Sequence, residues 1–265
     1  MAVSLISGAG LENPISSYCP NYDDDTTMER GLAEELSFDL NTVVNEKALF
    51  AIISQFVMRS ERVFGPQSWR FHYNVNVGSV PRLPRNFFNF WLTQEDSSHL
   101  PPVLCPQFID GQPFTLRLLG QLVKKPQNGG HASKYAYQSE ALTQHQNTPA
   151  GPACWLVMRK SVGARDESEA AQVLWIQSLN AGYETRPRAI HLATIVFTRH
   201  VLPKGERYLS DGSGQEGRWS VVRCRELLSY GRRRYPLAVG GFAPGGLLVD
   251  CPYYDQCVSV ALKMF

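Results

Sequence analysis

Short apolar runs separated by Gly-, Pro- and Asp-containing turns dominate the chain from residue 207 to its end. Only an extended chain reverses direction this often, so the pattern predicts strands of one antiparallel sheet. Upstream, residues 71–77 alternate between apolar and polar side chains, and residues 153–158 form a compact apolar run. The predicted strands cover residues 71–77, 153–159, 207–210, 219–224, 236–242 and 246–250.

Four helices are predicted where a capping residue precedes apolar positions spaced three or four apart. Asn45, Thr115, Asp166 and Thr185 are the expected capping residues, and each helix should begin within about three residues of its cap. Helices that are followed by a run of strands are typical of an α+β fold rather than of regular βαβ alternation. The sequence therefore predicts a C-terminal antiparallel sheet that is backed by helices.

The chain divides by composition into a leader and a body. Residues 1–45 are rich in Gly, Ser, Asn and Asp with little periodicity, which predicts a mobile acidic leader. Residues 46–265 should form a single domain, because 43% hydrophobic residues suffice for a sizeable core. No apolar run approaches the roughly 18 residues of a membrane span, and the start lacks the features of a signal peptide. We expect a soluble cytoplasmic protein without a transmembrane segment.

The cysteine and histidine spacings do not favour a metal site. The six cysteines include no CxxC pair, so most should be reduced, and Cys251 with Cys257 is the pair most open to a disulfide. His191 and His200 lie nine residues apart, which places them on opposite faces of one predicted helix. We expect no metal and no cofactor.

A glycine-rich run at residues 240–246 raises the question of a nucleotide site. It lacks the Lys and Ser/Thr of a P-loop, and strand-like segments flank it on both sides. A tight hairpin is therefore the favoured interpretation.

Arginines in the C-terminal region are the candidate ligand-binding residues. If two of the predicted strands are neighbours, Arg223 can pair with Asp211 across them, which leaves Arg207 or Arg225 to hold a carboxylate or phosphate. A purely structural cross-strand ion pair is the simpler alternative. Three further arginines form a compact basic tip in a turn, for which a solvated loop is the simpler account. The candidate set is Arg207, Asp211, Arg223, Arg225, Arg232, Arg233 and Arg234.

A catalytic thiol has weaker support. Cys154 could act as a nucleophile with His131 as its base, because such partners meet in space rather than in sequence. Cys154 lies inside an apolar run, however, where a cysteine commonly behaves as a small inert hydrophobic residue.

Several blocks of sequence together resemble a domain family found in the C-terminal portions of multidomain proteins of intracellular bacteria, beside leucine-rich or F-box-like segments, and of some animal proteins. The blocks are residues 113–126, Tyr135, 154–160, 208–211, 223–224 and 239–249. The resemblance covers about residues 105–265 and departs from the family pattern at Arg159-Lys160-Ser161 and around Arg232. It implies a place among interaction modules and carries no catalytic residue over to this chain.

Together these observations favour a non-enzymatic module that recognises another protein or a ligand. One alternative is an enzyme for an anionic or peptide substrate, with Arg207, Asp211 and Arg223 around a cleft. The other is a binder of nucleic acid or anionic lipid through the Arg232–Arg234 tip, although no nucleic-acid-binding motif accompanies it.

Overall fold

The computed structural model describes most of the chain beyond residue 62. The described residues are 63–83, 87, 99–165, 167–179, 182–209, 220–251 and 257–265. They all belong to one compact unit that spans residues 50–265. The predicted leader, the predicted helix after Asn45 and the candidate residue Asp211 lie outside the described residues.

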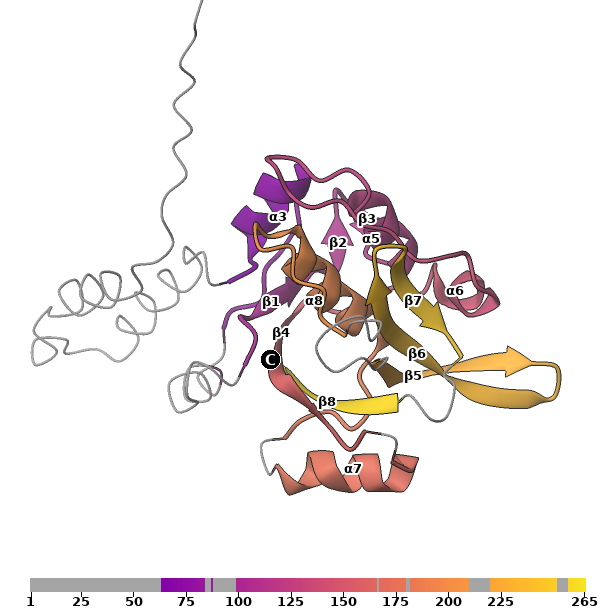
Figure 1. The fold of residues 1–265 in the computed structure, drawn as a ribbon. Helices are drawn as coiled ribbons and strands as arrows, with labels where there is room; N and C mark the ends of the chain where they lie inside the picture. Colours follow the sequence, from indigo (N-terminus) through magenta and orange to yellow (C-terminus); the bar gives the residue numbers. More distant parts are fainter. Residues whose placement is uncertain are drawn as a thin grey trace, which may run out of the picture. The chain divides into compact units, whose positions relative to one another are not determined.

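A six-stranded sheet forms the centre of the fold, with the strand order β1-β4-β8-β5-β6-β7 (Figure 1). Its strands are β1 (Val103–Cys105), β4 (Cys154–Gly163), β5 (Val221–Tyr230), β6 (Arg233–Ala243), β7 (Gly246–Asp250) and β8 (Cys257–Met264). Together with the helices around it, this sheet gives an α+β fold, as predicted. The strands are mostly antiparallel, as predicted, and β5 and β8 are the one parallel pair among the strand pairs described.

β8 joins the two halves of the sheet, and the sequence analysis missed it. It lies between β4 and β5, and its residues from Cys257 to Leu262 are all buried. A strand covered on both faces needs apolar residues at successive positions, so it lacks the alternation that marks a half-buried strand. Just beyond β8, the backbone N–H and C=O groups of Phe265 both bond to Trp155, each at 3.0 Å.

Five helices surround the sheet in the described part of the chain: α3 (Pro66–Tyr73), α5 (Leu116–Leu122), α6 (Glu140–His145), α7 (Glu169–Ser178) and α8 (Ala189–Val201). α7 packs against β8, whereas α8 contacts β1, β5 and β6 (Figure 1). The predicted Thr115 cap is confirmed, because its hydroxyl accepts a hydrogen bond from the Leu118 N–H at 3.2 Å. At α7 the capping hydroxyl belongs to Ser168 rather than to Asp166.

Two predicted strands are wrong. The first part of the 71–77 segment belongs to α3, whose start is marked by Pro66 at the first helical turn, a position where its missing N–H costs nothing. The alternation that suggested a strand arises because His72 and Tyr73 are buried on α3 and Val75 and Val77 are buried in the irregular segment after it. Residues 207–209 form a bend rather than a strand, with Leu209 in the left-handed region at φ 57°.

The helix α8 is buried almost throughout: every residue except Arg199 is buried. The hydroxyls of Thr194 and Thr198 each donate to the carbonyl four residues earlier at 2.7 Å, which satisfies them inside the core. No side chain next to it in sequence caps its start. Instead, the carboxylate of Glu226 on β5 accepts the Ala189 N–H at 3.0 Å.

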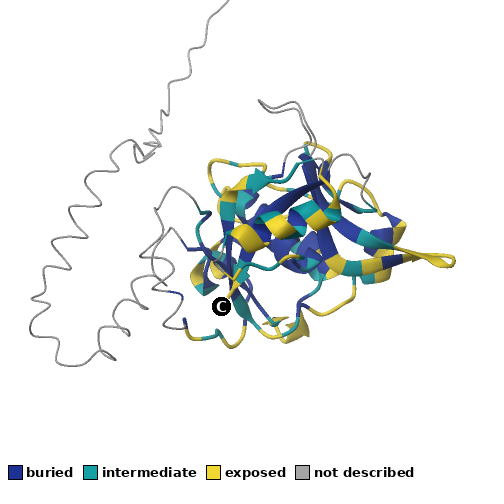
Figure 2. Cartoon of the chain, turned by 90° about the horizontal axis from the view of Figure 1, so that it is seen from below, coloured by how far each residue is buried: buried dark blue, intermediate teal, exposed yellow. Residues whose placement is uncertain are grey.

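The β5–β6 hairpin extends beyond the body of the domain (Figure 1), and its outer part is exposed (Figure 2). Residues 229–235, called the arginine hairpin below, contain its turn at Gly231 and Arg232. None of the described helices is both long and apolar enough to cross a membrane.

The glycine-rich run forms the β6–β7 hairpin, which confirms the favoured interpretation. Gly240 pairs with both Val221 and Leu248, so its backbone lies between two neighbouring strands. A Cβ atom at Gly240 would lie 2.1 Å from the Ser220 carbonyl oxygen, whereas one at Gly245 would meet nothing within 4 Å.

We therefore predict that Gly240→Ala lowers the free energy of unfolding by roughly 1–3 kcal/mol or more, because the backbone it would meet cannot move aside. Gly245→Ala is the matched control in the same run and should change the free energy of unfolding by less than about 0.5 kcal/mol. Urea denaturation measures both. Equal, small effects would contradict the close packing at Gly240.

Candidate functional site

A pocket of about 200 Å³ opens where three segments meet. The first precedes Tyr135, the second runs from the end of α8 to Arg207, and the third is the β6–β7 turn. Its lining residues, called the basic pocket below, are Ala132, Ser133, Lys134, His200, Arg207, Phe242, Ala243 and Pro244. Residues distant in sequence therefore form one concave surface.

Backbone hydrogen bonds hold these segments together. The Lys134 carbonyl accepts the Leu247 N–H at 2.9 Å, and the Leu209 carbonyl accepts the Phe242 N–H at 2.7 Å. Gly246 permits the close approach of the first segment, because a Cβ atom there would lie 2.5 Å from the Lys134 carbonyl oxygen. The pocket walls are therefore fixed by the sheet.

The charged side chains that line the pocket are basic. Lys134 and Arg207 are both exposed, and neither forms an ion pair with a carboxylate in the described part of the chain. The carboxylate next to Arg207 in sequence, Glu206, bonds instead to Arg199 at 2.8 Å. No acidic side chain is among the described residues that line the pocket. The two cations are therefore available to an anion.

His200 forms the buried wall of the basic pocket. Its Nδ1 donates to the Gly205 carbonyl at 2.9 Å, and its ring meets Phe242 edge to face at 4.9 Å between centroids. Burial is the main cause that lowers the pKa of His200, and the nearby Arg207 and His131 lower it further against the opposing backbone hydrogen bonds. His200 is therefore mostly neutral at pH 7.

His131 lies next to this pocket and not beside Cys154. Its ring centroid is 5.7 Å from that of His200, and its Nε2 donates to the Pro203 carbonyl at 3.0 Å. The proposed Cys154–His131 pair is therefore wrong. His191 takes that place, since it is the imidazole that lowers the pKa of the Cys154 thiol.

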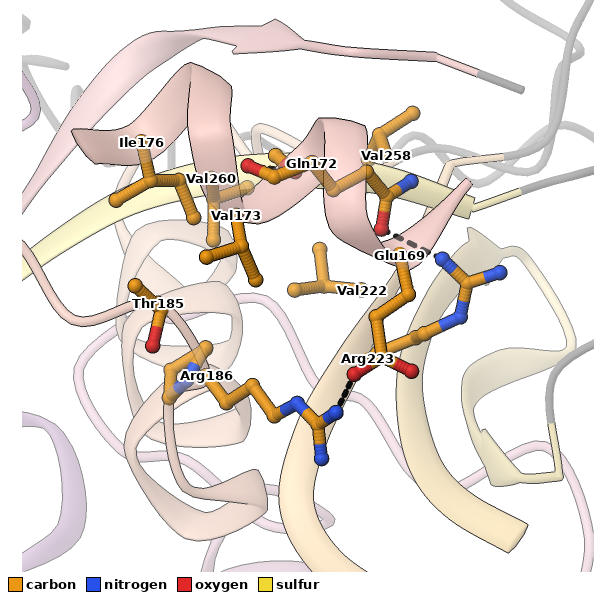
Figure 3. Close-up of a pocket in the computed structure, with 12 residues that line it drawn as sticks. Glu169, Gln172, Val173, Ile176, Thr185, Arg186, Val222, Arg223, Val258 and Val260 are labelled. Atoms are coloured by element: carbon orange, nitrogen blue, oxygen red, sulfur yellow. Dashed lines mark hydrogen bonds and ion pairs between the residues drawn. The ribbon is translucent and has the colours of Figure 1, made fainter. Parts of the chain in front are cut away.

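Arg223 lies in a different and much smaller cavity, under α7 (Figure 3). Its Nη1 donates to the Gln172 side-chain oxygen at 2.6 Å, while Glu169 and Arg186 form an ion pair at the rim. The Gln172 amide also donates to the carbonyls of Ala164 and Cys257, each at 3.1 Å. The cavity has a volume of about 10 Å³, enough for about one water molecule. It is a packing seam rather than a ligand site.

The arginines predicted to line one cleft are thus separated. Arg207 belongs to the basic pocket and Arg223 to the seam under α7. Arg225 has a side chain that is 60% exposed and that contacts Glu184 at 3.5 Å. Arg232 and Arg234 lie on the exposed arginine hairpin with Arg233. Of the predicted ligand-binding residues, Arg207 is the one that lines the basic pocket.

Cys105, Cys154, Cys224 and Cys251 are free thiols. Cys251 therefore forms no disulfide with Cys257, the partner considered for it in the sequence. Within the described segments, no group of three or more His, Cys, Asp and Glu side chains is arranged to hold a metal ion.

Sequence reasoning identified Arg207 but missed Lys134 and His200. Both are ordinary surface or helix residues in the sequence, and only the bridge between Tyr135 and Leu247 brings the Lys134 segment to the β6–β7 turn. No local motif signals that contact.

Comparison with known proteins gives no relative: no family model, curated protein or solved structure matches the chain. The family resemblance of residues 105–265 stays a prediction.

The hydrogen bond between Arg223 and Gln172 under α7 leads to a prediction about stability. Arg223→Ala leaves the buried Gln172 oxygen without its donor, so it should lower the free energy of unfolding by about 1–3 kcal/mol. This loss of stability is smaller than the loss expected when one member of a buried ion pair is removed, because the partner of Arg223 is a neutral amide. Arg225→Ala, which breaks an exposed contact, should cost less than about 1 kcal/mol. Chemical denaturation that ranks the two variants in the opposite order would contradict this assignment.

Proposed function

We propose that this protein is a recognition module that binds a phosphate group, carried by a partner protein or a small ligand, in the basic pocket. The observation that carries the proposal is the approach of Lys134 and Arg207 to one concave surface without a carboxylate among its described lining residues. Two cations that lack a counter-ion favour an anionic ligand.

A phosphate monoester fits this arrangement better than a carboxylate. It carries about two negative charges at pH 7, which match the two cations, and it has three acceptor oxygens for the guanidinium, the ammonium and the Ser133 hydroxyl that line the pocket. Neutral His200 can take up a proton as the anion binds, which adds a third cation. These features support a dianionic group.

The size of the pocket supports recognition of a group rather than of a whole molecule. Its 200 Å³ lie below the roughly 300–1,000 Å³ of sites that enclose drug-sized ligands. Most of the ligand would therefore stay outside the pocket, as expected for a phosphorylated side chain on a partner's surface. Among the described lining residues, Ser133 is the sole hydroxyl and there is no thiol or carboxylate, which favours binding over catalysis.

The arginine hairpin supports a second candidate, the binding of an acidic protein surface. Arg232, Arg233 and Arg234 are exposed at its end, and the rings of Tyr230 and Tyr235 meet at 6.2 Å. The base of the hairpin is held by Gln144 of α6, whose amide bonds to both the N–H and the C=O of Ser229. A rigid, exposed cationic arm is suited to electrostatic contact.

Titration calorimetry with inorganic phosphate at low ionic strength distinguishes the two sites. Arg207→Gln and Lys134→Gln should each weaken phosphate binding about tenfold, because each removes one charge-assisted contact. Arg232→Gln, which also removes one positive charge, is the matched control and should leave the affinity nearly unchanged. Acetate should bind more weakly than phosphate to the unaltered protein.

The reverse pattern, in which only the hairpin variant loses phosphate, would overturn the basic pocket and favour the hairpin. No measurable phosphate binding to the unaltered protein at low salt would overturn both. Circular dichroism of each variant checks that the fold is retained.

A further inference from the structure

Cys105 and Cys154 face each other across two neighbouring strands. They are directly opposed in the register of β1 and β4. The Leu104 N–H bonds to Phe64 on the other side of β1, so the polar backbone groups of Cys105 point toward Cys154. Such a hydrogen-bonded pair has Cα atoms about 5.5 Å apart, within the range that a disulfide spans. Each thiol is also the main cause of the pKa shift of the other.

The buried imidazole of His191 lies close to the two thiols. His191, in the first turn of α8, is only 2% exposed, and neither of its ring nitrogens has a well-aligned hydrogen-bond partner. Among the side chains that lower the pKa of the Cys154 thiol, His191 comes next after Cys105. A buried histidine that lacks partners is costly to keep in a core unless its nitrogens have another use.

Charged groups from three further positions surround the pair. Arg188, at the cap of α8, acts on both thiols, and both Arg188 and Arg225 of β5 lower the pKa of Glu184. One carboxylate oxygen of Glu184 contacts Arg225 at 3.5 Å, and the other is buried without a partner. Cys154 itself is half-buried, whereas Cys105 is fully covered. The outer thiol is therefore the one that a small reagent reaches.

We propose that Cys154 is a modification site, a reactive thiol that peroxides oxidise, and that Cys105 is the thiol that resolves the product into a disulfide. The site shares no residue with the basic pocket, so it does not depend on the proposed function.

The chemistry balances with a peroxide as the oxidant. The Cys154 thiolate attacks one peroxide oxygen, an S–O bond forms, the O–O bond breaks, and the leaving oxygen takes up a proton. The Cys105 sulfur then attacks the Cys154 sulfur and loses its proton. The S–S bond forms as the S–O bond breaks, and water leaves. Before the first step, the imidazole of His191, which lowers the pKa of the Cys154 thiol, can take up the proton of that thiol.

The surroundings favour the thiolate form of Cys154. The hydrogen bond from the Cys105 thiol lowers the pKa of Cys154, burial opposes this, and His191 and Arg188 lower the pKa further. That same hydrogen bond is the main cause that raises the pKa of Cys105, which burial raises as well. In contrast, burial and the neighbouring Asp250 raise the pKa of the half-buried Cys251. Cys251 is therefore a control within the same chain.

The pH dependence of alkylation by iodoacetamide, followed by peptide mass spectrometry, tests the proposal on the full chain. Between pH 6.5 and 8.5 the Cys154 rate should change less than about twofold, because the thiolate is already formed. The Cys251 rate should rise about 100-fold over this range, following its thiolate fraction. The slope is the useful readout, since a low pKa also reduces the intrinsic nucleophilicity of a thiol.

Hydrogen peroxide supplies the second test. The unaltered protein should lose two hydrogens and yield a peptide linked through Cys105 and Cys154, whereas Cys105→Ser should stop at a sulfenic acid on Cys154 that dimedone traps. His191→Asn should raise the pKa of Cys154 and so steepen its pH slope, although Cys105 and Arg188 still lower that pKa. If that variant does not fold, the first two measurements still decide the matter. Equal slopes at Cys154 and Cys251, or dimedone labelling that favours Cys251, would overturn the proposal.

Discussion

The burial of α8 against the sheet is the constraint on which the rest of the structure depends. This helix contacts β1, β5, β6 and α5, and all of its residues but Arg199 are removed from water. Each fully buried Leu, Ile, Val or Phe in such a position contributes roughly 1.5–3 kcal/mol of hydrophobic stabilisation. The helix carries His191 at its start and His200 near its end, on opposite faces, so its docking positions both the thiol pair and the basic pocket. Glu226 orients it from β5 by accepting a hydrogen bond from the N–H of Ala189, the first residue of the helix.

Much of the fold could be predicted from local signals. Thr115 caps its helix as expected, β7 has the expected bounds of 246–250, and Asp110-Gly111 forms the two-residue turn of the small hairpin between β2 (Phe108–Ile109) and β3 (Gln112–Pro113). Each of these depends on residues close in sequence. β8 was missed because a strand that is buried on both faces shows no regular alternation of apolar and polar residues, and α6 because six residues are too few for a periodic pattern.

The candidate sites were harder to predict, since each depends on pairing partners that the sequence does not specify. Arg207 was identified from its charge, but Lys134 reaches it through the contact between Tyr135 and Leu247. Cys154 was paired with His131 because both looked plausible alone, while the register of β1 with β4 gives it Cys105 and the docking of α8 gives it His191. Arg223 was assigned a charged partner and instead holds the amide of Gln172. The types of these side chains made them candidates, but their neighbours are determined by the topology of the fold.

The two sites differ in how far their charged groups are exposed to water. The basic pocket keeps its cations exposed, where they are unpaired but hydrated, and it relies on a ligand to bring the negative charge. The thiol cluster is mostly removed from water, so each charge there acts strongly on its neighbours. Because the two ends of one rigid helix separate them, a ligand in the pocket has no direct contact with the thiols.

The most direct test of the central claim, that an anion binds in the basic pocket, is the pKa of His200 measured by NMR with and without sulfate. Sulfate remains a dianion across the titration, so the change reports on the histidine alone. Without an anion the pKa should lie below 6.5, as burial dictates. Bound sulfate should raise it, because the anion stabilises the imidazolium, and by linkage sulfate should bind more tightly as the pH falls through that pKa. Arg207→Gln should greatly reduce the shift. A His200 pKa that saturating sulfate leaves unchanged would contradict the account.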